Sequence, residues 1–355
     1  MIPLLHPARS RRVGIVLLSG IGDVVHGLPI ACDLKREDPE REVVWVAQRA
    51  PAEVVRHHPA VDRVVVFDKG AGLRGVRALQ NAFRGRTCDL TLNFMRYIKG
   101  SVAAALTGAP VRLGLPPSKT RDGAARFNTH SLAETPWMHT QDMFLRFRTP
   151  LGIPADAPVE WKVSFTAGER AERDAFFREL RKTHGRPIVG LVLATANAKK
   201  DWPADRLPAL SRALVERTGA HVVLVGGPSS RERAAAEAIA ATGVPVTNTL
   251  GDSVRRMMWV VDGVDALISP DTGPLHLAHA LGTPVVGLFG HTNPYRVGPW
   301  RRSRDLVIDR YTDPGEAPDP SRYDPRQGRM EQITVDDILT ATERALRGSM
   351  DAVPS

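Results

Sequence analysis

The sequence has few cysteines and no long apolar run. Only Cys32 and Cys88 occur among 355 residues, too few for a disulfide-rich secreted scaffold or a cysteine-built metal site, which favours a reducing compartment. No apolar run approaches the roughly 20 residues that span a bilayer. The apolar stretch Val13–Leu18 follows several arginines, as in a signal peptide, but it is shorter than the ~7–15 residues of a signal-peptide core. We therefore expect a cytoplasmic protein whose chain begins with a buried strand.

Several motifs of common enzyme classes are also missing. The chain contains no Asp-x-Asp, no His/Cys/carboxylate cluster with metal-site spacing, no P-loop and no Gly-x-Ser-x-Gly. A divalent metal that bridges a diphosphate is therefore not expected, and neither is another cofactor. Nucleic acid is an unexpected partner as well, because the sequence has no RNP-type aromatic pair, zinc-finger spacing or long basic run.

Length and charge indicate a two-domain protein with an uneven surface. A chain of 355 residues exceeds the usual single-domain size, and 43% hydrophobic with 25% charged residues is ordinary for a globular protein. The net charge is +9, and most of the excess lies in residues 1–160. Two interpretations stay open: general solubility, or an anionic partner such as an acidic glycolipid or a membrane surface.

Short apolar runs alternate with helical patterns along the whole chain, which predicts two doubly wound α/β units. The Pro-rich stretch Thr149–Pro158 is the expected linker. We expect domains at residues 1–155 and 156–335, followed by a helix and tail at 336–355. The expected strands have little polar alternation, as in parallel sheets covered on both faces: Val13–Leu18, Val43–Val46, Val64–Phe67, Leu90–Asn93, Ile188–Leu193, His221–Val225, Ala266–Ile268 and Pro284–Phe289.

Two segments do not fit the alternation. Pro116–Pro136 is polar, basic and without period, so we expect a long loop of the first domain, and such loops are often functional. Tyr311–Arg329 is rich in Pro, Asp and Arg and is expected to be an irregular surface excursion, to which the sequence assigns no role.

One strand end has the pattern of a phosphate site. The strand Ala266–Ile268 leads through Asp271, Thr272 and Gly273 into a helix that begins at Pro274. Proline in the first turn is a typical helix start, and a helix N-terminus at a strand end offers N–H groups and partial positive charge to a phosphate. His276 falls in the first turn, where it could face a ligand. An ordinary capped turn is the alternative.

A glycine-rich segment, Ser19–Pro29, follows the first strand. The spacing of its glycines fails the G-x-G-x-x-G pattern, and no acid at the end of the second strand could hold a ribose, which argues against NAD. We expect a tight glycine turn that presents the carboxylate of Asp23, which could act as a general base. Capping of the following helix is the alternative role.

Two further loops carry candidate groups of the second domain. Thr195 and Lys200 follow its first strand, and a lysine there could stabilise a departing pyrophosphate. Glu232 lies in the Gly226–Glu232 loop and is a candidate for ribose hydroxyls. The alternatives are a solvated surface lysine and a glutamate that supports the start of a helix.

Together these stretches resemble glycosyltransferase family 9, whose best-known members are ADP-heptose:lipopolysaccharide heptosyltransferases. The matching segments span most of the chain in the same order: residues 22–29, 200–203, 271–284 and 288–294, with 101–114 and 142–154 also similar. Departures are His279, where the family usually has a small residue, Ala196, where it often has a hydroxyl, and the absence of cysteines from residues 311–330.

The resemblance implies a GT-B fold, with two Rossmann-like domains facing across a cleft, the acceptor on the first and the nucleotide sugar on the second. It implies metal-independent, inverting transfer of a sugar, expected to be heptose from ADP-heptose, onto a lipopolysaccharide core or related anionic acceptor. Asp23 matches the base and Lys200 a catalytic lysine, Thr195, Thr272 and Gly273 match positions around the diphosphate, and Asp271 and His276 lie in the donor-side motif. Glu232 is counted with the donor side on its own loop position.

On this interpretation the basic first half attracts the acceptor. Arg112, Lys119, Arg121 and Arg126 are its candidate contacts, and we expect peripheral contact with the inner face of the membrane. The alternatives are a nucleotide-sugar epimerase or hydrolase of the same fold, a transferase for another nucleotide sugar, and a nucleotide-binding protein without catalysis.

Overall fold

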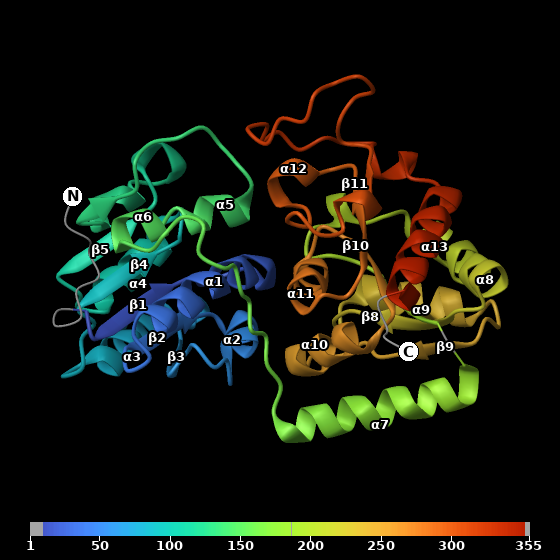
Figure 1. The fold of residues 1–355 in the computed structure, drawn as a ribbon, viewed down its shortest axis with the longest axis horizontal. Coiled ribbons are helices and arrows are strands. Elements are labelled where there is room, and N and C mark those ends of the chain that lie inside the picture. Colours follow the sequence, from blue (N-terminus) through green and yellow to red (C-terminus); the bar gives the residue numbers. More distant parts are fainter. Residues whose placement is uncertain (1–9, 186, 352–355) are drawn as a thin grey trace. The chain divides into compact units, whose positions relative to one another are not determined.

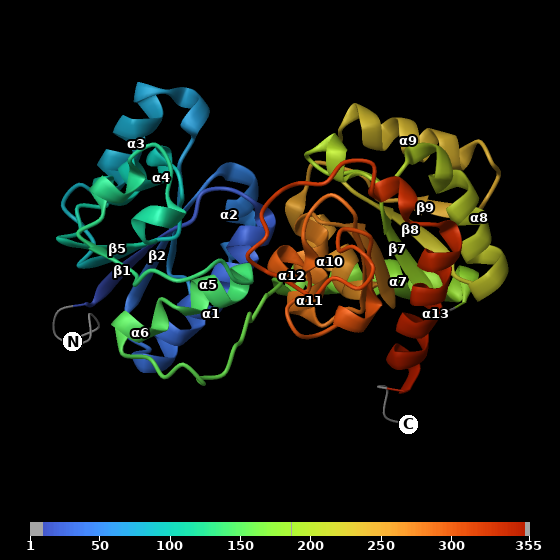
Figure 2. The ribbon, with the colours of Figure 1, turned by 90° about the horizontal axis from the view of Figure 1, so that it is seen from above.

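The computed structural model describes residues 10–185 and 187–351, which form two compact units, residues 1–164 and 165–355 (Figure 1). Each unit is described by itself. Within the described residues each unit contains one parallel six-stranded sheet. The helices of each unit form two groups. In the first unit, α1 packs with α2 and α5, while α3 packs with α4 (Figure 2). This is the doubly wound α/β arrangement that the sequence predicts.

The sheet of the first unit has the order β3-β2-β1-β4-β5-β6. Its strands are Arg12–Val16 (β1), Glu42–Ala47 (β2), Arg63–Val66 (β3), Leu90–Asn93 (β4), Val111–Gly114 (β5) and His130–Ser131 (β6). Its helices are Ile21–Glu37 (α1), Arg49–Val55 (α2), Leu73–Phe83 (α3), Ile98–Leu106 (α4), Thr140–Leu145 (α5) and Arg148–Leu151 (α6). The two cysteines are free and buried in this unit.

The sheet of the second unit has the order β12-β11-β10-β7-β8-β9. Its strands are Ile188–Val192 (β7), His221–Val225 (β8), Val246–Asn248 (β9), Ala266–Pro270 (β10), Val285–Phe289 (β11) and Val307–Asp309 (β12). Its helices are Ala167–His184 (α7), Leu207–Thr218 (α8), Ser230–Ala240 (α9), Val254–Gly263 (α10), Gly273–Leu281 (α11), Pro294–Val297 (α12) and Val335–Asp351 (α13).

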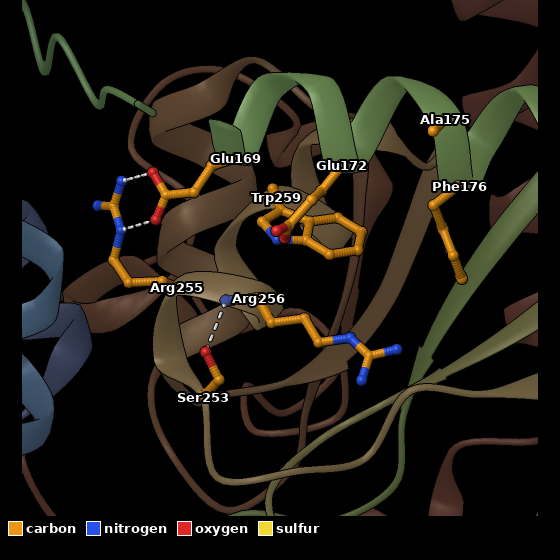
Figure 3. Close-up of a pocket in the computed structure, with 8 residues that line it drawn as sticks. All are labelled: Glu169, Glu172, Ala175, Phe176, Ser253, Arg255, Arg256 and Trp259. Carbon is orange, nitrogen blue, oxygen red and sulfur yellow. Dashed lines mark hydrogen bonds and ion pairs between the residues drawn. The ribbon is translucent and has the colours of Figure 1, made fainter. Parts of the chain in front are cut away.

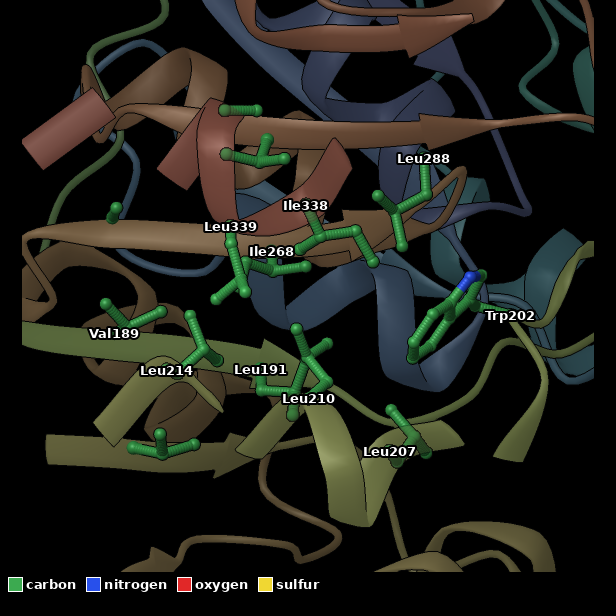
Figure 4. Packing of buried hydrophobic residues seen from close by; sticks show 14 of the residues in the cluster. Val189, Leu191, Trp202, Leu207, Leu210, Leu214, Ile268, Leu288, Ile338 and Leu339 are labelled. Atoms are coloured by element: carbon green, nitrogen blue, oxygen red, sulfur yellow. The ribbon is translucent and has the colours of Figure 1, made fainter. Parts of the chain in front are cut away.

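Apolar residues of β7, α8, β10 and α13 form the core on one face of this sheet, with Leu191, Leu210 and Ile338 among them (Figure 4). The segment expected as a separate helix and tail thus packs on the second unit through α13, which contacts α8, β10 and β11. Residues 352–355 of that tail lie outside the described residues. Trp202 inserts into the same core, and its Nε1 donates to the carbonyl of Ile333 at 3.0 Å.

The first unit extends past the expected boundary at residue 155. The buried guanidinium of Arg148 pairs with the buried carboxylate of Asp33 on α1 at 2.7 Å and also donates to the carbonyls of Ala155, Ala157 and Pro158. Further along, the carbonyl of Trp161 lies 2.7 Å from Nε2 of His58. These contacts bind the expected linker to the first unit, so the boundary falls between Ser164 and Phe165.

Two local expectations need correction. The glycine-rich segment is helical from Ile21, because Val24, Val25 and Leu28 are buried along α1, and only Gly20 adopts a left-handed turn, with φ of 81°. The 116–136 segment is not a simple loop: it holds two short 3-10 turns and the edge strand β6. No helix or strand is assigned between Arg310 and Arg329, as the sequence predicts.

Candidate active site

The predicted phosphate-type helix start is present at the end of β10. Thr272 is the N-cap of α11 in extended backbone conformation, Pro274 lies in the first turn, and Gly282 ends the nine-residue helix in the left-handed region. The side chain of Thr272 makes no capping hydrogen bond. Since the first N–H groups of a helix have no partner within it, this terminus has donors and a partial positive charge to offer an anion.

Three side chains contact the carboxylate of Asp271 at that helix start. Lys200 Nζ lies 2.6 Å from Oδ2, the Thr292 hydroxyl donates to the same oxygen at 2.9 Å, and His276 Nε2 lies 3.5 Å from Oδ1. Burial by itself would raise the pKa of Asp271, but the hydrogen bond from His276 and the charge of Lys200 outweigh it and hold that pKa below its usual range. Asp271 is therefore an ionised partner of Lys200 and makes no cap for α11.

The loop that carries Lys200 is fixed from both sides. The N–H of Thr195 donates to Asp201 Oδ1 at 2.7 Å, and Thr195 Oγ1 donates to the carbonyl of Asn197 at 2.7 Å. Arg231 pairs with Asp201 and donates to the carbonyl of Thr195 at 2.8 Å. Because Trp202 is anchored in the core directly after this loop, the loop holds Lys200 where its ammonium meets Asp271.

Glu232 has a structural role at the start of α9. It forms a capping box with Ser229, and its Oε1 accepts from the N–H of Gly227 at 2.7 Å. A Cβ placed on Gly226 would lie 2.5 Å from the same carboxylate oxygen. The glutamate thus shapes the Gly226–Ser229 turn, the alternative role that the sequence left open for it.

Asp23 lies in the first turn of α1, directly after β1, and its side chain is exposed. Gly20, which precedes the helix, has a φ of 81° that favours glycine, and a Cβ there would lie 2.6 Å from Asp23 Oδ2. One turn further, buried His26 faces α5: its Nδ1 lies 3.1 Å from Gln141 Oε1, while Gln141 Nε2 donates to the His26 carbonyl at 2.9 Å. These bonds fix the start of α1 and thereby the place of Asp23.

The structure divides the four candidate acceptor cations into two kinds. Arg112 donates to the carbonyls of Phe127 and Ala109, both at 2.7 Å. Lys119 is buried, donates to the carbonyl of Thr135 at 2.6 Å and lies over the ring of Trp137. Both therefore hold the 116–136 segment together, which the sequence could not show.

Arg121 and Arg126 are exposed, and with Thr120 and Gly123 they line a pocket of about 450 Å³. Neither guanidinium forms an ion pair with another residue of the described ranges. Arg121 begins a tight turn, closed by a bond from the N–H of Ala124 to its carbonyl at 2.9 Å, and its own N–H donates to the carbonyl of Arg96 at 2.7 Å. Asp122 also lines this pocket, so two guanidiniums and one carboxylate leave it with an excess of positive charge that suits an anion.

A second pocket, of about 610 Å³, lies between α7 and α10 and contains none of the predicted site residues (Figure 3). Glu169 and Arg255 form a two-pronged ion pair at its rim, with distances of 2.7 and 2.6 Å. Within the described part of the chain, no group of three or more His, Cys, Asp or Glu side chains is arranged to hold a metal ion. None of the described helices is long and apolar enough to cross a membrane.

Sequence reasoning missed Thr292, Arg231 and Gln141 as members of these clusters. Thr292 follows β11, which pairs with β10 in parallel, so the rule that parallel strand ends share one edge could have placed it beside Asp271. Arg231 contacts Thr195, which is 36 positions away in the sequence, and Gln141 contacts His26, which is 115 positions away. The sequence has no local signal for such contacts.

The profile of glycosyltransferase family 9 (heptosyltransferase) matches residues 76–321. The lipopolysaccharide core heptosyltransferase OpsX of Haemophilus influenzae is 25% identical over 295 residues, which cover 82% of this chain and 83% of OpsX. A family 9 glycosyltransferase from Veillonella parvula superposes with a TM-score of 0.80 at 20% identity, covering 95% and 98% of the two chains. E. coli heptosyltransferase WaaC, solved with ADP, superposes with a TM-score of 0.74 at 20% identity, covering 94% and 99%. The fold is the GT-B fold expected from the sequence, and the chain belongs to glycosyltransferase family 9.

Proposed function

We propose that this glycosyltransferase moves heptose from ADP-heptose onto a lipopolysaccharide core or a related anionic glycan. The observation that carries the proposal is the Lys200–Asp271 pair at the start of α11, which joins a fixed cation to a helix N-terminus on the donor unit. Both features suit a diphosphate. The heptosyltransferase relatives, one of them solved with ADP, support the choice of donor.

In the proposed step, a hydroxyl of the acceptor attacks the anomeric carbon while the bond from that carbon to the diphosphate oxygen breaks. The electron pair of the broken bond leaves with ADP, and attack from the opposite side inverts the anomeric centre. Asp23 takes the proton of the hydroxyl as general base. Lys200 and the N–H groups of α11 offset the charge that develops on the departing ADP, so the step needs no metal in this proposal.

For the donor we assign Thr195, Asp271, Thr272, Gly273 and His276 to the surroundings of the diphosphate and sugar. Glu232 contributes through the turn that it shapes, and it offers its remaining lone pairs to a ribose. Oδ2 of Asp271 is held by Lys200 and Thr292, while Oδ1, which lies 3.5 Å from His276 Nε2, is the oxygen that we assign to the sugar.

For the acceptor we assign the Arg121–Arg126 pocket to an anionic group. Asp23 lies in the first turn of α1, which follows β1, and Arg121 lies in the segment that follows β5. The two parallel strands are separated by β4 alone, so both groups follow the carboxyl edge of one sheet, and we propose that one acceptor meets both. The same cations would attract an anionic membrane surface, and we propose peripheral contact there.

The test is a transfer assay with purified protein and a panel of ADP-, UDP- and GDP-linked sugars, with a lipopolysaccharide core acceptor analysed by mass spectrometry. We expect the acceptor to gain one heptose unit with ADP-heptose alone. Transfer of a different sugar would replace the donor assignment. Release of free sugar without glycosylated acceptor, or isomerised nucleotide sugar, would favour a hydrolase or an epimerase.

A further inference from the structure

The excursion at residues 311–329 is an ordered segment although it contains no helix or strand. Its acidic and basic side chains pair with each other: Asp313 with Arg326 and Arg329, and Glu316 with Arg322 and Arg326. The hydroxyl of Tyr311 donates to the carbonyl of Asp324 at 2.8 Å, and Arg296 lies over the ring of Tyr323. These contacts, with the buried ring of Tyr311 at its start, give the segment one shape.

The excursion is attached to the turn at residues 290–293, which follows β11. Asn293 Nδ2 donates to the carbonyls of Asp319 at 2.8 Å and Arg322 at 3.1 Å. His291 and Arg326 are joined twice, because the N–H of Arg326 donates to the His291 carbonyl at 3.0 Å and His291 Nδ1 lies 2.6 Å from the Arg326 carbonyl. A Cβ at Gly290 would lie 2.5 Å from backbone atoms of Arg329 and Met330, so the two segments touch closely.

Thr292 lies between the two attachment points, His291 and Asn293. Its hydroxyl donates to Asp271 Oδ2 at 2.9 Å, the oxygen that also receives Lys200 at 2.6 Å. A short path of contacts therefore leads from the excursion through one turn to the pair that carries the proposed donor site. Neither the excursion nor Asn293 touches Lys200 or Asp271 directly in the contacts of the described residues.

From this arrangement we infer that residues 311–329 are a positioning element of the donor site, and that they act on Lys200 through Thr292 and Asp271. The inference rests on the proposed function, in which Lys200 meets the diphosphate. Hydrogen bonds to three sides fix the Asp271 carboxylate, and the carboxylate in turn fixes the long, flexible side chain of Lys200. If the turn loses its attachment, the hydroxyl of Thr292 loses its position and the ammonium loses its orientation. A misplacement of about 1 Å can cost on the order of 100-fold in rate.

The test is a double-mutant cycle between Asn293→Ala and Thr292→Val, with transfer kinetics and calorimetric ADP titration as readouts. Each single variant is expected to lower kcat by roughly 10- to 100-fold and to weaken ADP binding, with the KM for acceptor unchanged. The double variant is expected to be no worse than the poorer single variant, because both changes interrupt one path. Thr292→Ser keeps the hydroxyl and is expected to restore both readouts.

The matched control is Thr87→Val, which changes an exposed threonine of the first unit that has no side-chain hydrogen bond in the described ranges. It is expected to leave kcat and ADP binding at wild-type values. Multiplicative losses in the double variant, or an Asn293→Ala protein that is less stable but binds ADP and turns over normally, would overturn the inference. Wild-type protein that binds ADP but does not use ADP-heptose would count against the proposed donor, while the ADP titrations would still test the path.

Discussion

Lys200 and Asp271 are 71 residues apart in sequence, yet Nζ of the lysine lies 2.6 Å from Oδ2 of the aspartate. The lysine follows β7 and the aspartate follows β10, two neighbouring parallel strands. The pair therefore forms at the carboxyl edge of one sheet, where doubly wound proteins bind their ligands. It joins two separate features of the sequence, a loop lysine and a helix start, into one cluster, which we propose as the diphosphate site.

Removing the lysine tests the proposed role of this site. Lys200→Ala is expected to lower kcat by about 100- to 1,000-fold, the range found when one group that stabilises developing charge is lost. The adjacent Lys199 is exposed, and Lys199→Ala is the matched control, with kcat expected near the wild-type value. Steady-state transfer kinetics measure both variants. Equal effects of the two substitutions would point to a general loss of positive charge and away from a specific contact.

The proposed acceptor role of the Arg121–Arg126 pocket leads to a prediction that separates acceptor binding from the chemical step. Arg121→Ala and Arg126→Ala are expected to raise the KM for an anionic acceptor several-fold and to weaken the dependence of that KM on salt concentration. Each substitution removes a charge attraction that salt screens. The kcat and the donor KM are expected to stay unchanged. Arg178 is an exposed arginine on α7, and Arg178→Ala serves as control. An acceptor KM that does not respond to either pocket variant would remove this assignment.

A buried ion pair joins Arg148 to Asp33 of α1 in the first unit. Arg148 and Asp33 are both buried and 2.7 Å apart. Arg148→Met removes one of the two arginines that contact the Asp33 carboxylate, the other being Arg36 at 2.7 Å, and is expected to cost up to about 3–5 kcal/mol of the free energy of unfolding. Arg56→Met removes an exposed partner of Glu53 and is expected to cost less than about 1 kcal/mol. Denaturant unfolding measures both. Similar small losses would mean that Asp33 finds other partners, such as Arg36.

Acid stability depends on buried histidines. Burial, with the nearby charges of His276 and Arg302, lowers the pKa of His279 from 6.5 to about 4. Between these values the unfolded chain binds more protons than the folded chain, so stability falls as the pH is lowered from about 6.5 to about 4. His279→Asn is expected to reduce that slope in pH-dependent unfolding. Part of the slope is expected to remain, because burial lowers the pKa of His221 to about 4 as well. An unchanged slope would contradict this origin.

The sequence predicted the strands that are continuous apolar runs, as in β8 and β4, whose ends match the expected ones. It missed β5, β6, β9 and β12, which have two to four residues each and are not continuous buried apolar runs. It also predicted α11, because Pro274 and Gly282 mark both ends of that helix. The sequence analysis missed the start of α1, because Gly22, Gly27 and Pro29 are residues typical of turns. The segment is helical and buries its valines.

The candidate site was predictable residue by residue but not as a network. Asp271, Lys200 and His276 were all named from their own motifs, whereas their mutual contacts and the part of Thr292 depend on strand order. The separation of Arg112 and Lys119 from Arg121 and Arg126 depends on which backbone carbonyls lie near each cation. No local pattern encodes such contacts.

The most direct test of the account is transfer from ADP-heptose to a lipopolysaccharide core acceptor by wild-type protein and by Asp23→Asn, followed by mass spectrometry. Asp23 is exposed in the first turn of α1, so the substitution is expected to leave folding and ADP binding intact. We predict one added heptose per acceptor for the wild type and a rate at least about 100-fold lower for Asp23→Asn, as for the loss of a general base. Heptose transfer at the wild-type rate by Asp23→Asn, or no transfer from ADP-heptose by the wild type, would contradict the account.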